Sequence, residues 1–122
     1  MTLFSLAEAR AEVSRLLPTV DEFVAIRADA ADLGAALGAG RPTALGGLPE
    51  FKAAQARMDE LMTQIQAVGA DLKGFAPLLL DFPAELDGEP VLLCWLEGDR
   101  ELGWYHRLDS GFPGRRRLPR TG

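Results

Sequence analysis

Residues 78–108 read LLLDFPAELDGEPVLLCWLEGDRELGWYHRL, and this stretch decides the fold. Apolar side chains recur at every second position, which is typical of β-strands with one buried face. Turn-forming residues interrupt the pattern twice, at Asp87-Gly88 and at residues 97–100. Asp-Gly is a strong signal for a two-residue hairpin turn. We therefore predict three antiparallel strands joined as a meander.

The two turns also predict which side chains share a face of this sheet. A two-residue first turn sets Leu80 opposite Trp95, and a four-residue second loop sets Val91 opposite His106. Together these registers place both tryptophans on one face, with His106 at its rim and Cys94 on the opposite face. A slip of one residue in either turn would undo this agreement. The predicted core face consists of Leu80, Phe82, Val91, Leu93, Trp95, Leu102 and Trp104.

The first half of the chain predicts two long amphipathic helices. Ser5 and Glu8 have the spacing of a capping box, after which apolar residues recur at three- and four-residue steps. Pro18 interrupts this pattern, so we expect the first helix to be kinked or broken there. The Gly- and Pro-rich segment 38–50 predicts a loop, and a second helix should follow it and end at Gly69.

These elements predict an α+β fold in one domain spanning residues 1–122. A long antiparallel helical hairpin at 5–69 should pack on the three-stranded antiparallel meander at 75–108, with a Gly/Pro/Arg-rich tail at 109–122. A chain of 122 residues with 48% apolar residues can bury one core. The second sheet face is also apolar, so we expect a homodimer to cover it. This second face consists of Leu79, Leu92, Cys94, Leu96 and Tyr105.

Charge and cysteine content exclude several classes of protein. The net charge of −5 argues against a general nucleic-acid binder. The single cysteine, Cys94, excludes an internal disulfide and a multi-cysteine metal site, so we predict no metal, no cofactor and a cytoplasmic location. The longest apolar run is too short to span a membrane, and we expect no signal peptide. No catalytic constellation can be identified, so the sequence predicts no catalytic residues and does not indicate an enzyme.

Residues 104–117, WYHRLDSGFPGRRR, hold the candidate ligand-binding residues. His106, the single histidine, can act as a base or an anion ligand, with Asp109 orienting it. Arg115 can bind a carboxylate or phosphate through its planar fork, and Trp104 can stack on a ligand. The alternative is a structural histidine at the rim of the sheet, whose ring is satisfied by a backbone carbonyl or by Asp109.

Other polar residues have simpler interpretations. The buried thiol of Cys94 should be inert. The acids at 81, 87, 97 and 99 are interpreted as turn residues that form local hydrogen bonds. The run Arg115–Arg117 with Arg120 is either a solvated end of the chain, the interpretation we favour, or an arm that binds an acidic partner or RNA.

Three stretches of the chain resemble a known family: FSLAEA with LLP near the start, DFPAELDGEPVLLCW in the middle and WYHRLDSGFPGR at the end. They are similar to the bacterial family catalogued as domain of unknown function 2203, over nearly the whole chain. The resemblance supports the architecture and implies no reaction. The chain departs from the family pattern at Tyr105 and Pro113. The matching positions are His106, Asp109, Gly111, Phe112, Gly114 and Arg115.

Two functions remain open on the sequence. The first is a small cytoplasmic protein-interaction or regulatory module, with protein contacts made by the helical hairpin and the second sheet face. The alternative is a small-molecule or anion-binding domain, with an enzyme among the options, whose site contains His106, Asp109 and Arg115.

Overall fold

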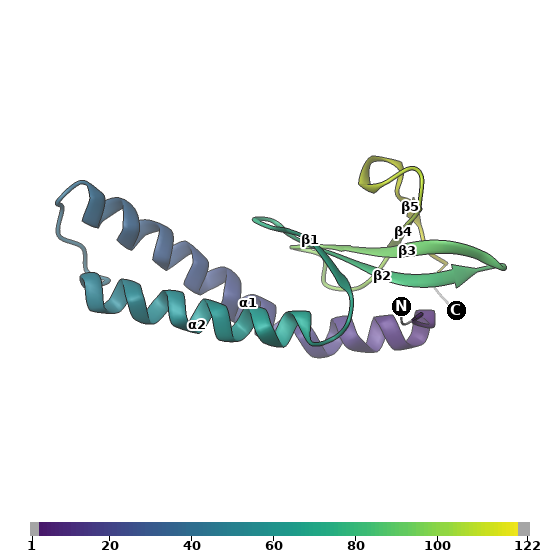
Figure 1. Cartoon of the computed structure of the whole chain (residues 1–122), viewed down its shortest axis with the longest axis horizontal. Coiled ribbons are helices and arrows are strands. Elements are labelled where there is room, and N and C mark those ends of the chain that lie inside the picture. Colours follow the sequence, from purple (N-terminus) through teal and green to yellow (C-terminus); the bar gives the residue numbers. More distant parts are fainter. Residues whose placement is uncertain (1–2, 120–122) are drawn as a thin grey trace. The chain divides into compact units, whose positions relative to one another are not determined.

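The computed structural model describes residues 3–119 (Figure 1). The chain divides into two compact units, one made of Met1–Leu17 with Gln66–Gly122 and the other of Pro18–Ile65. The described part contains two helices and a five-stranded antiparallel sheet, which confirms the α+β class but not the predicted three strands. The elements are α1 (Leu6–Gly38), α2 (Leu48–Gln66), β1 (Asp71–Phe75), β2 (Leu78–Leu86), β3 (Glu89–Leu96), β4 (Trp104–Arg107), the 3-10 helix η1 (Phe112–Gly114) and β5 (Arg116–Arg117).

The two strands that the sequence did not reveal lie at the edges of the sheet, whose order is β1-β2-β3-β4-β5. β1 pairs with β2 through an irregular register between Leu72 and Gly74. A Cβ at Gly74 would lie 3.1 Å from the carbonyl oxygen of Pro77, so the two segments approach closely there. β5 has two residues, both arginines, and therefore carries no apolar alternation that a sequence pattern could detect.

The first predicted hairpin is confirmed residue by residue. Leu86 lies opposite Glu89 across the Asp87-Gly88 turn, and Leu80 lies opposite Trp95. Asp87 and Gly88 both have positive φ, as a two-residue type I′ turn requires.

The second predicted hairpin is wrong by one residue. His106 lies opposite Leu92 instead of Val91, and Trp104 lies opposite Cys94 instead of Leu93. Because successive side chains of a strand point to opposite faces, this slip turns every side chain of β4 to the other side of the sheet. Trp95 and Trp104 therefore lie on opposite faces, and His106 shares the face of Cys94.

The loop between β3 and β4 explains the slip. The loop consists of Glu97–Gly103 and is therefore longer than the four residues expected. Hydrogen bonds to Asp99 hold its first residues against the end of β3. The amide of Leu96 donates to the Asp99 carboxylate at 3.1 Å, and the Trp95 indole nitrogen donates to the Asp99 carbonyl at 3.0 Å. Leu102 is buried, as expected, but it lies in this loop and not in the strand.

Helix α1 begins and ends with the predicted signals. The Ser5 amide donates to Glu8 Oε1 at 2.8 Å and the Glu8 amide donates to Ser5 Oγ at 3.0 Å, which is a complete capping box. At the other end, Gly40 has a φ of 65°, and the Arg41 amide donates back to the Ala36 carbonyl at 2.8 Å. These contacts form a Schellman motif, which satisfies carbonyl groups in the last turn.

Pro18 does not interrupt α1, so the predicted break there is wrong. The proline removes the N–H that would bond the carbonyl of Ser14. Both residues are exposed, so water can hydrogen-bond that carbonyl in place of the missing amide. The helix can therefore continue past the proline.

The core of the first unit lies between the first turns of α1 and one face of the sheet. Phe82 is fully buried, and the ring of Phe4 meets it edge-on with centroids 5.2 Å apart. The Phe4 amide also donates to the Pro83 carbonyl at 2.8 Å, which holds the chain beside β2 as it enters α1. The other buried apolar residues of this unit include Ala9, Val13, Leu16, Leu80, Ala84, Val91, Leu93, Trp95 and Leu102.

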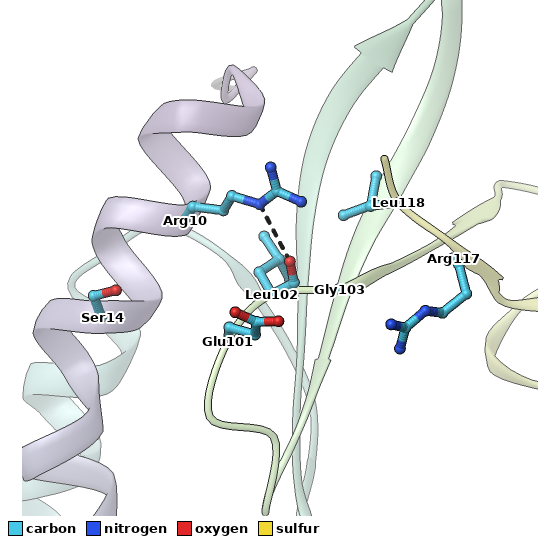
Figure 2. Close-up of a pocket in the computed structure, with 7 residues that line it drawn as sticks. All are labelled: Arg10, Ser14, Glu101, Leu102, Gly103, Arg117 and Leu118. Carbon is cyan, nitrogen blue, oxygen red and sulfur yellow. Dashed lines mark hydrogen bonds between the residues drawn. The ribbon is translucent and has the colours of Figure 1, made fainter. Parts of the chain in front are cut away.

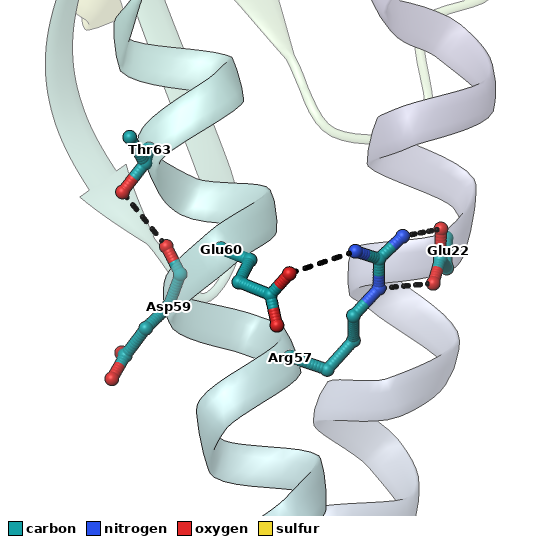
Figure 3. A network of polar contacts seen from close by, with 5 residues as sticks. All are labelled: Glu22, Arg57, Asp59, Glu60 and Thr63. Atoms are coloured by element: carbon teal, nitrogen blue, oxygen red, sulfur yellow. Dashed lines mark hydrogen bonds and ion pairs between the residues drawn. The ribbon is translucent and has the colours of Figure 1, made fainter.

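In the second unit, α1 and α2 form the predicted antiparallel hairpin. Arg57 of α2 donates from Nε and Nη2 to the two carboxylate oxygens of Glu22 on α1, at 2.8 and 2.9 Å (Figure 3). These hydrogen bonds lower the pKa of Glu22 and raise the pKa of Arg57. Exposed ion pairs contribute little to stability. Most of the stability of this unit therefore comes from its buried apolar side chains, which include Phe23, Leu33, Leu61 and Ile65. Neither described helix is long and apolar enough to cross a membrane.

Replacing Phe82 with alanine tests this core. The change should lower the free energy of unfolding by about 3–5 kcal/mol, because it leaves a cavity where a fully buried ring meets Phe4. Chemical denaturation measures the loss. Phe75→Ala is the matched control, since that ring is 58% exposed and should cost far less. Equal losses in the two variants would contradict the packing.

Candidate functional site

Three adjacent strands bring three different polar side chains to one face of the sheet. Asp81 on β2 lies opposite Cys94 on β3, which lies opposite Trp104 on β4, and His106 follows two residues later on the same face. Asp81 is 3% exposed, Cys94 is 0% exposed and His106 is 4% exposed. One ligand atom of each, a carboxylate oxygen, a sulfur and an imidazole nitrogen, lies within 4.8 Å of the others. Carboxylate, thiol and imidazole groups of this kind bind transition metals in proteins.

The two ring nitrogens of His106 face different partners. Nδ1 lies 2.9 Å from the carbonyl oxygen of Arg107, and Nε2 lies 3.3 Å from each carboxylate oxygen of Asp81. A carbonyl oxygen only accepts hydrogen bonds, so Nδ1 carries a proton and donates it. An unprotonated Nε2 would then direct its lone pair at a carboxylate. A proton or another cation must therefore lie between Nε2 and Asp81.

The guanidinium group of Arg115 packs against two aromatic rings. Its central carbon is 4.5 Å from the ring centroid of Trp104 and 4.6 Å from that of Phe112. These two cation–π contacts restrict the position of the guanidinium group. Its Nη1 atom is buried and has no hydrogen-bond partner among the described residues. A buried N–H group without an acceptor is costly, so this atom calls for a ligand or an ordered water.

A compact turn positions Arg115. Gly111 has a φ of 64°, which favours glycine, and the Arg115 amide donates to the Phe112 carbonyl at 3.1 Å. A Cβ at Gly114 would lie 2.7 Å from the Cβ of Ser110, so this position has no room for a side chain. The glycines of the GFPG sequence therefore let η1 fold tightly against β4.

The thiol of Cys94 is neutral at physiological pH. Burial is the main cause that raises its pKa to about 12, and the charge of Asp81 adds to the shift. The charge of Arg115 opposes the shift, so the guanidinium group lies near the sulfur. A protonated, buried thiol is a poor nucleophile, which agrees with the interpretation of Cys94 as inert.

The structure brings together three of the four predicted site residues. His106, Trp104 and Arg115 lie on one face of the sheet, on and beside β4. Asp109 is exposed on the turn after β4, and Asp81 is the acid that faces His106. The alternative interpretation was a structural histidine that bonds a backbone carbonyl. It accounts for the contact of Nδ1 with the Arg107 carbonyl but not for the contact of Nε2 with Asp81.

Sequence reasoning missed Asp81 and Cys94 as site residues. The interpretation as turn acids that form local hydrogen bonds is right for Asp99, which accepts from the Leu96 amide, and it is wrong for Asp81. Glu97 accepts instead from the Leu78 amide of another strand, at 2.9 Å. The correctly predicted first hairpin already placed Asp81 opposite Cys94. A carboxylate in the middle of an apolar strand is a signal of a buried polar site, and this signal could have found it.

The segment after β4 covers part of the face that was expected to need a second copy of the protein. Arg115 packs over Trp104 and over Phe112, and β5 pairs with β4. Leu118 is buried, and its amide donates to the Gly103 carbonyl at 2.8 Å. Arg115 therefore packs against the domain, whereas Arg116 and Arg117 pair with β4 and keep exposed side chains. Arg120 lies outside the described residues.

A cavity of about 460 Å³ lies beside the start of α1 and the loop before β4 (Figure 2). Arg10 donates from Nε to the Leu102 carbonyl at 3.3 Å and from Nη2 to the Pro119 carbonyl at 2.7 Å. These bonds indicate that Arg10 ties the end of the described chain to the helix. Asp81, Cys94 and His106 do not line this cavity, so it is distinct from the candidate site. The lining residues are Arg10, Ser14, Glu101, Leu102, Gly103, Arg117 and Leu118.

Alkylation tests the environment of Cys94. In chelator-treated, folded protein at neutral pH, iodoacetamide should modify Cys94 far more slowly than in denaturant, because the thiol is buried and protonated. The pKa shift also has a consequence for stability. A pKa raised from 9.0 to about 12 gives a stabilising contribution that is fully present below pH 9 and is lost as the pH rises toward 12.

The free energy of unfolding should accordingly fall more steeply above pH 9 in the wild type than in Cys94→Ala. Denaturation curves at several pH values give the free energy of unfolding of each protein. The difference between the two proteins at each pH isolates Cys94, because the other groups that titrate in this range are present in both. Parallel pH dependence in the two proteins, or fast alkylation of the folded chain, would show that the thiol is not buried as described.

Comparison with known proteins gives one match. The family model described as Uncharacterized conserved protein (DUF2203) matches residues 2–118. No curated protein and no solved structure matches the chain.

Proposed function

Because the chain belongs to the DUF2203 family, whose description names no activity, we propose a function from the site itself: the chain is a small domain that binds an anionic group, a carboxylate or a phosphate, at Arg115. The observation that carries this proposal is the buried Nη1 of Arg115, which has no hydrogen-bond acceptor among the described residues. His106 and Trp104, predicted as ligand-binding residues, lie beside it. In this proposal Asp81, which faces His106 Nε2, orients the imidazole, the role that the sequence suggested for Asp109.

The charges of the cluster support an anionic ligand. Asp81 and His106 together are neutral when one proton lies between them, whichever residue carries it. Cys94 is a neutral thiol, so the positive charge of Arg115, a half-buried residue whose Nη1 atom is buried, has no opposite charge left in the cluster. None of the ion pairs among residues 3–119 includes Arg115. A buried charge without a partner is unfavourable, and an anion would neutralise it.

The geometry of Arg115 favours an oxyanion over a single halide ion. A guanidinium group presents parallel N–H groups that match the two oxygens of a carboxylate or phosphate. Trp104 and Phe112 both pack against the group, and its N–H groups lie at its edge, where an oxyanion can accept hydrogen bonds. The aromatic rings thereby hold the fork in place before binding, which reduces the entropy lost on binding.

Replacing Arg115 with methionine tests this proposal. Chelator-treated wild-type protein should bind inorganic phosphate or acetate in calorimetric titrations, and Arg115→Met should bind about 10–100-fold more weakly, since hydrogen bonds to charged groups contribute roughly 1.5–3 kcal/mol. Arg115→Lys should lose part of the affinity, because lysine keeps the charge but not the fork.

The matched control is Arg116→Met, which removes the same charge from an exposed neighbouring residue. This variant should bind as the wild type does. Thermal melts verify that each variant is folded. Failure of the wild type to bind either anion, or equal weakening in the Arg115 and Arg116 variants, would refute the assignment.

A protein-interaction module is the second candidate, and one observation favours it. Three leucines near the loop of the helical hairpin, Leu37, Leu45 and Leu48, are exposed. Exposed apolar side chains of this kind are common at protein interfaces.

The homodimer remains part of this second proposal, as does a separate protein partner. A cytoplasmic location is likewise retained as a proposal, supported by the free thiol of Cys94.

Light scattering tests the homodimer. The wild-type chain at high concentration should have twice the mass of one chain. The triple variant Leu37→Ser, Leu45→Ser, Leu48→Ser should shift toward the monomer if the hairpin loop makes the interface. A monomeric wild-type protein at every concentration would exclude the dimer.

A further inference from the structure

We infer that Asp81, Cys94 and His106 bind one divalent transition-metal ion of the zinc type, which is a function beyond anion binding and does not rest on it. The three side chains come from three neighbouring strands of one sheet, so the backbone fixes their separation. Their ligand atoms lie within 4.8 Å of one another, and all three residues are more than nine-tenths buried. Sites on rigid strands hold metal ligands more accurately than loops do.

The second contact of His106 is the kind that supports a metal ligand. Histidines that bind a metal through one ring nitrogen usually donate the other N–H to a carboxylate or backbone carbonyl. His106 does so from Nδ1 to the Arg107 carbonyl at 2.9 Å. This bond leaves Nε2 free for the metal and directs it toward Asp81.

The separation between His106 and Asp81 fits metal ligands better than a direct hydrogen bond. Nε2 lies 3.3 Å from both carboxylate oxygens. A hydrogen bond between an imidazolium and a carboxylate is typically about 2.7–2.9 Å. Two ligand atoms bound tetrahedrally to zinc, each at about 2.0–2.1 Å from the ion, lie roughly 3.3–3.4 Å apart. The cation that must lie between Nε2 and Asp81 is therefore assigned as the metal.

The chemistry of the donors selects the class of ion. Sulfur, nitrogen and oxygen ligands together suit zinc, cobalt and related ions, whereas magnesium and calcium bind oxygen ligands. On binding, two protons pass to solvent. The S–H bond of Cys94 breaks as a sulfur–metal bond forms, and the proton between His106 and Asp81 leaves as the imidazole nitrogen and a carboxylate oxygen bind the metal. No electrons are transferred, since zinc and cobalt remain divalent.

The charge of the site is compatible with this ion and with an anion beside it. The metal contributes two positive charges, which the thiolate and the Asp81 carboxylate balance. Arg115 again leaves one positive charge, the same excess that the metal-free cluster has. Three protein ligands leave a tetrahedral ion one further position, which a water molecule or an anionic group can fill.

Cobalt titration tests the metal site directly. Chelator-treated protein without a histidine tag should bind one Co²⁺ per chain and develop a near-ultraviolet thiolate-to-cobalt absorption band. Zn²⁺ added afterwards should displace cobalt and abolish the band. Cys94→Ser should lack the band, and His106→Gln should bind cobalt at least tenfold more weakly.

Asp109→Asn is the matched control, because it removes an exposed acid close to His106 in sequence but outside the cluster. This variant should bind cobalt as the wild type does. X-ray absorption of the zinc-loaded wild type gives a second measurement that needs no variant to fold. It should show one sulfur ligand at about 2.3 Å together with nitrogen and oxygen ligands.

Absence of the cobalt band at stoichiometric metal, retention of the band in folded Cys94→Ser, or a zinc shell without sulfur would overturn the inference. These outcomes are separable from those of the anion experiment, which uses metal-free protein and measures Arg115. Metal binding without anion binding would leave this inference intact, and anion binding without metal binding would leave the proposed function intact.

Discussion

The closure of the loop between β3 and β4 is the constraint on which the site depends. Asp99 accepts a hydrogen bond from the Leu96 amide through its carboxylate and one from the Trp95 indole through its carbonyl. These bonds, together with the positive φ at Gly98, close the turn that ends β3. Residues 100–103 then complete the seven-residue loop, and β4 pairs with His106 opposite Leu92. Had β4 paired one residue earlier or later, His106 would face the apolar core instead of Asp81 and Cys94.

The resulting sheet has two faces with different roles. One face packs Phe82, Leu93 and Trp95 with the start of α1 and supplies the stability of its unit. The other face buries a carboxylate, a thiol and an imidazole beneath the segment that carries Arg115. Buried polar groups lower stability unless their partners are complete. In this cluster a guanidinium nitrogen has no hydrogen-bond partner and an imidazole nitrogen faces a carboxylate. Bound ligands explain this arrangement better than a purely structural role of the side chains does.

Local interactions made much of the fold predictable from the sequence. The Ser5–Glu8 capping box, the glycine end of α1 and the Asp87-Gly88 hairpin each depend on residues a few positions apart, and all three are confirmed. The second hairpin was not predictable, because a seven-residue loop does not determine a register. The candidate site could be predicted only in part, because some of its residues are brought together by strand pairing and not by closeness in sequence. His106, Trp104 and Arg115 are close in sequence, whereas Asp81 and Cys94 join them only through the pairing of β2, β3 and β4.

The contacts of the His106 ring test this account most directly. In nuclear Overhauser spectra, the ring protons of His106 should show cross-peaks to the β protons of Asp81 and Cys94, because all three side chains lie on one face of the sheet. Cross-peaks to Val91 and Ala84 in their place would establish the register of a four-residue loop. That result would mean that His106 lies on the core face of the sheet, away from Asp81 and Cys94, and would contradict the proposed site.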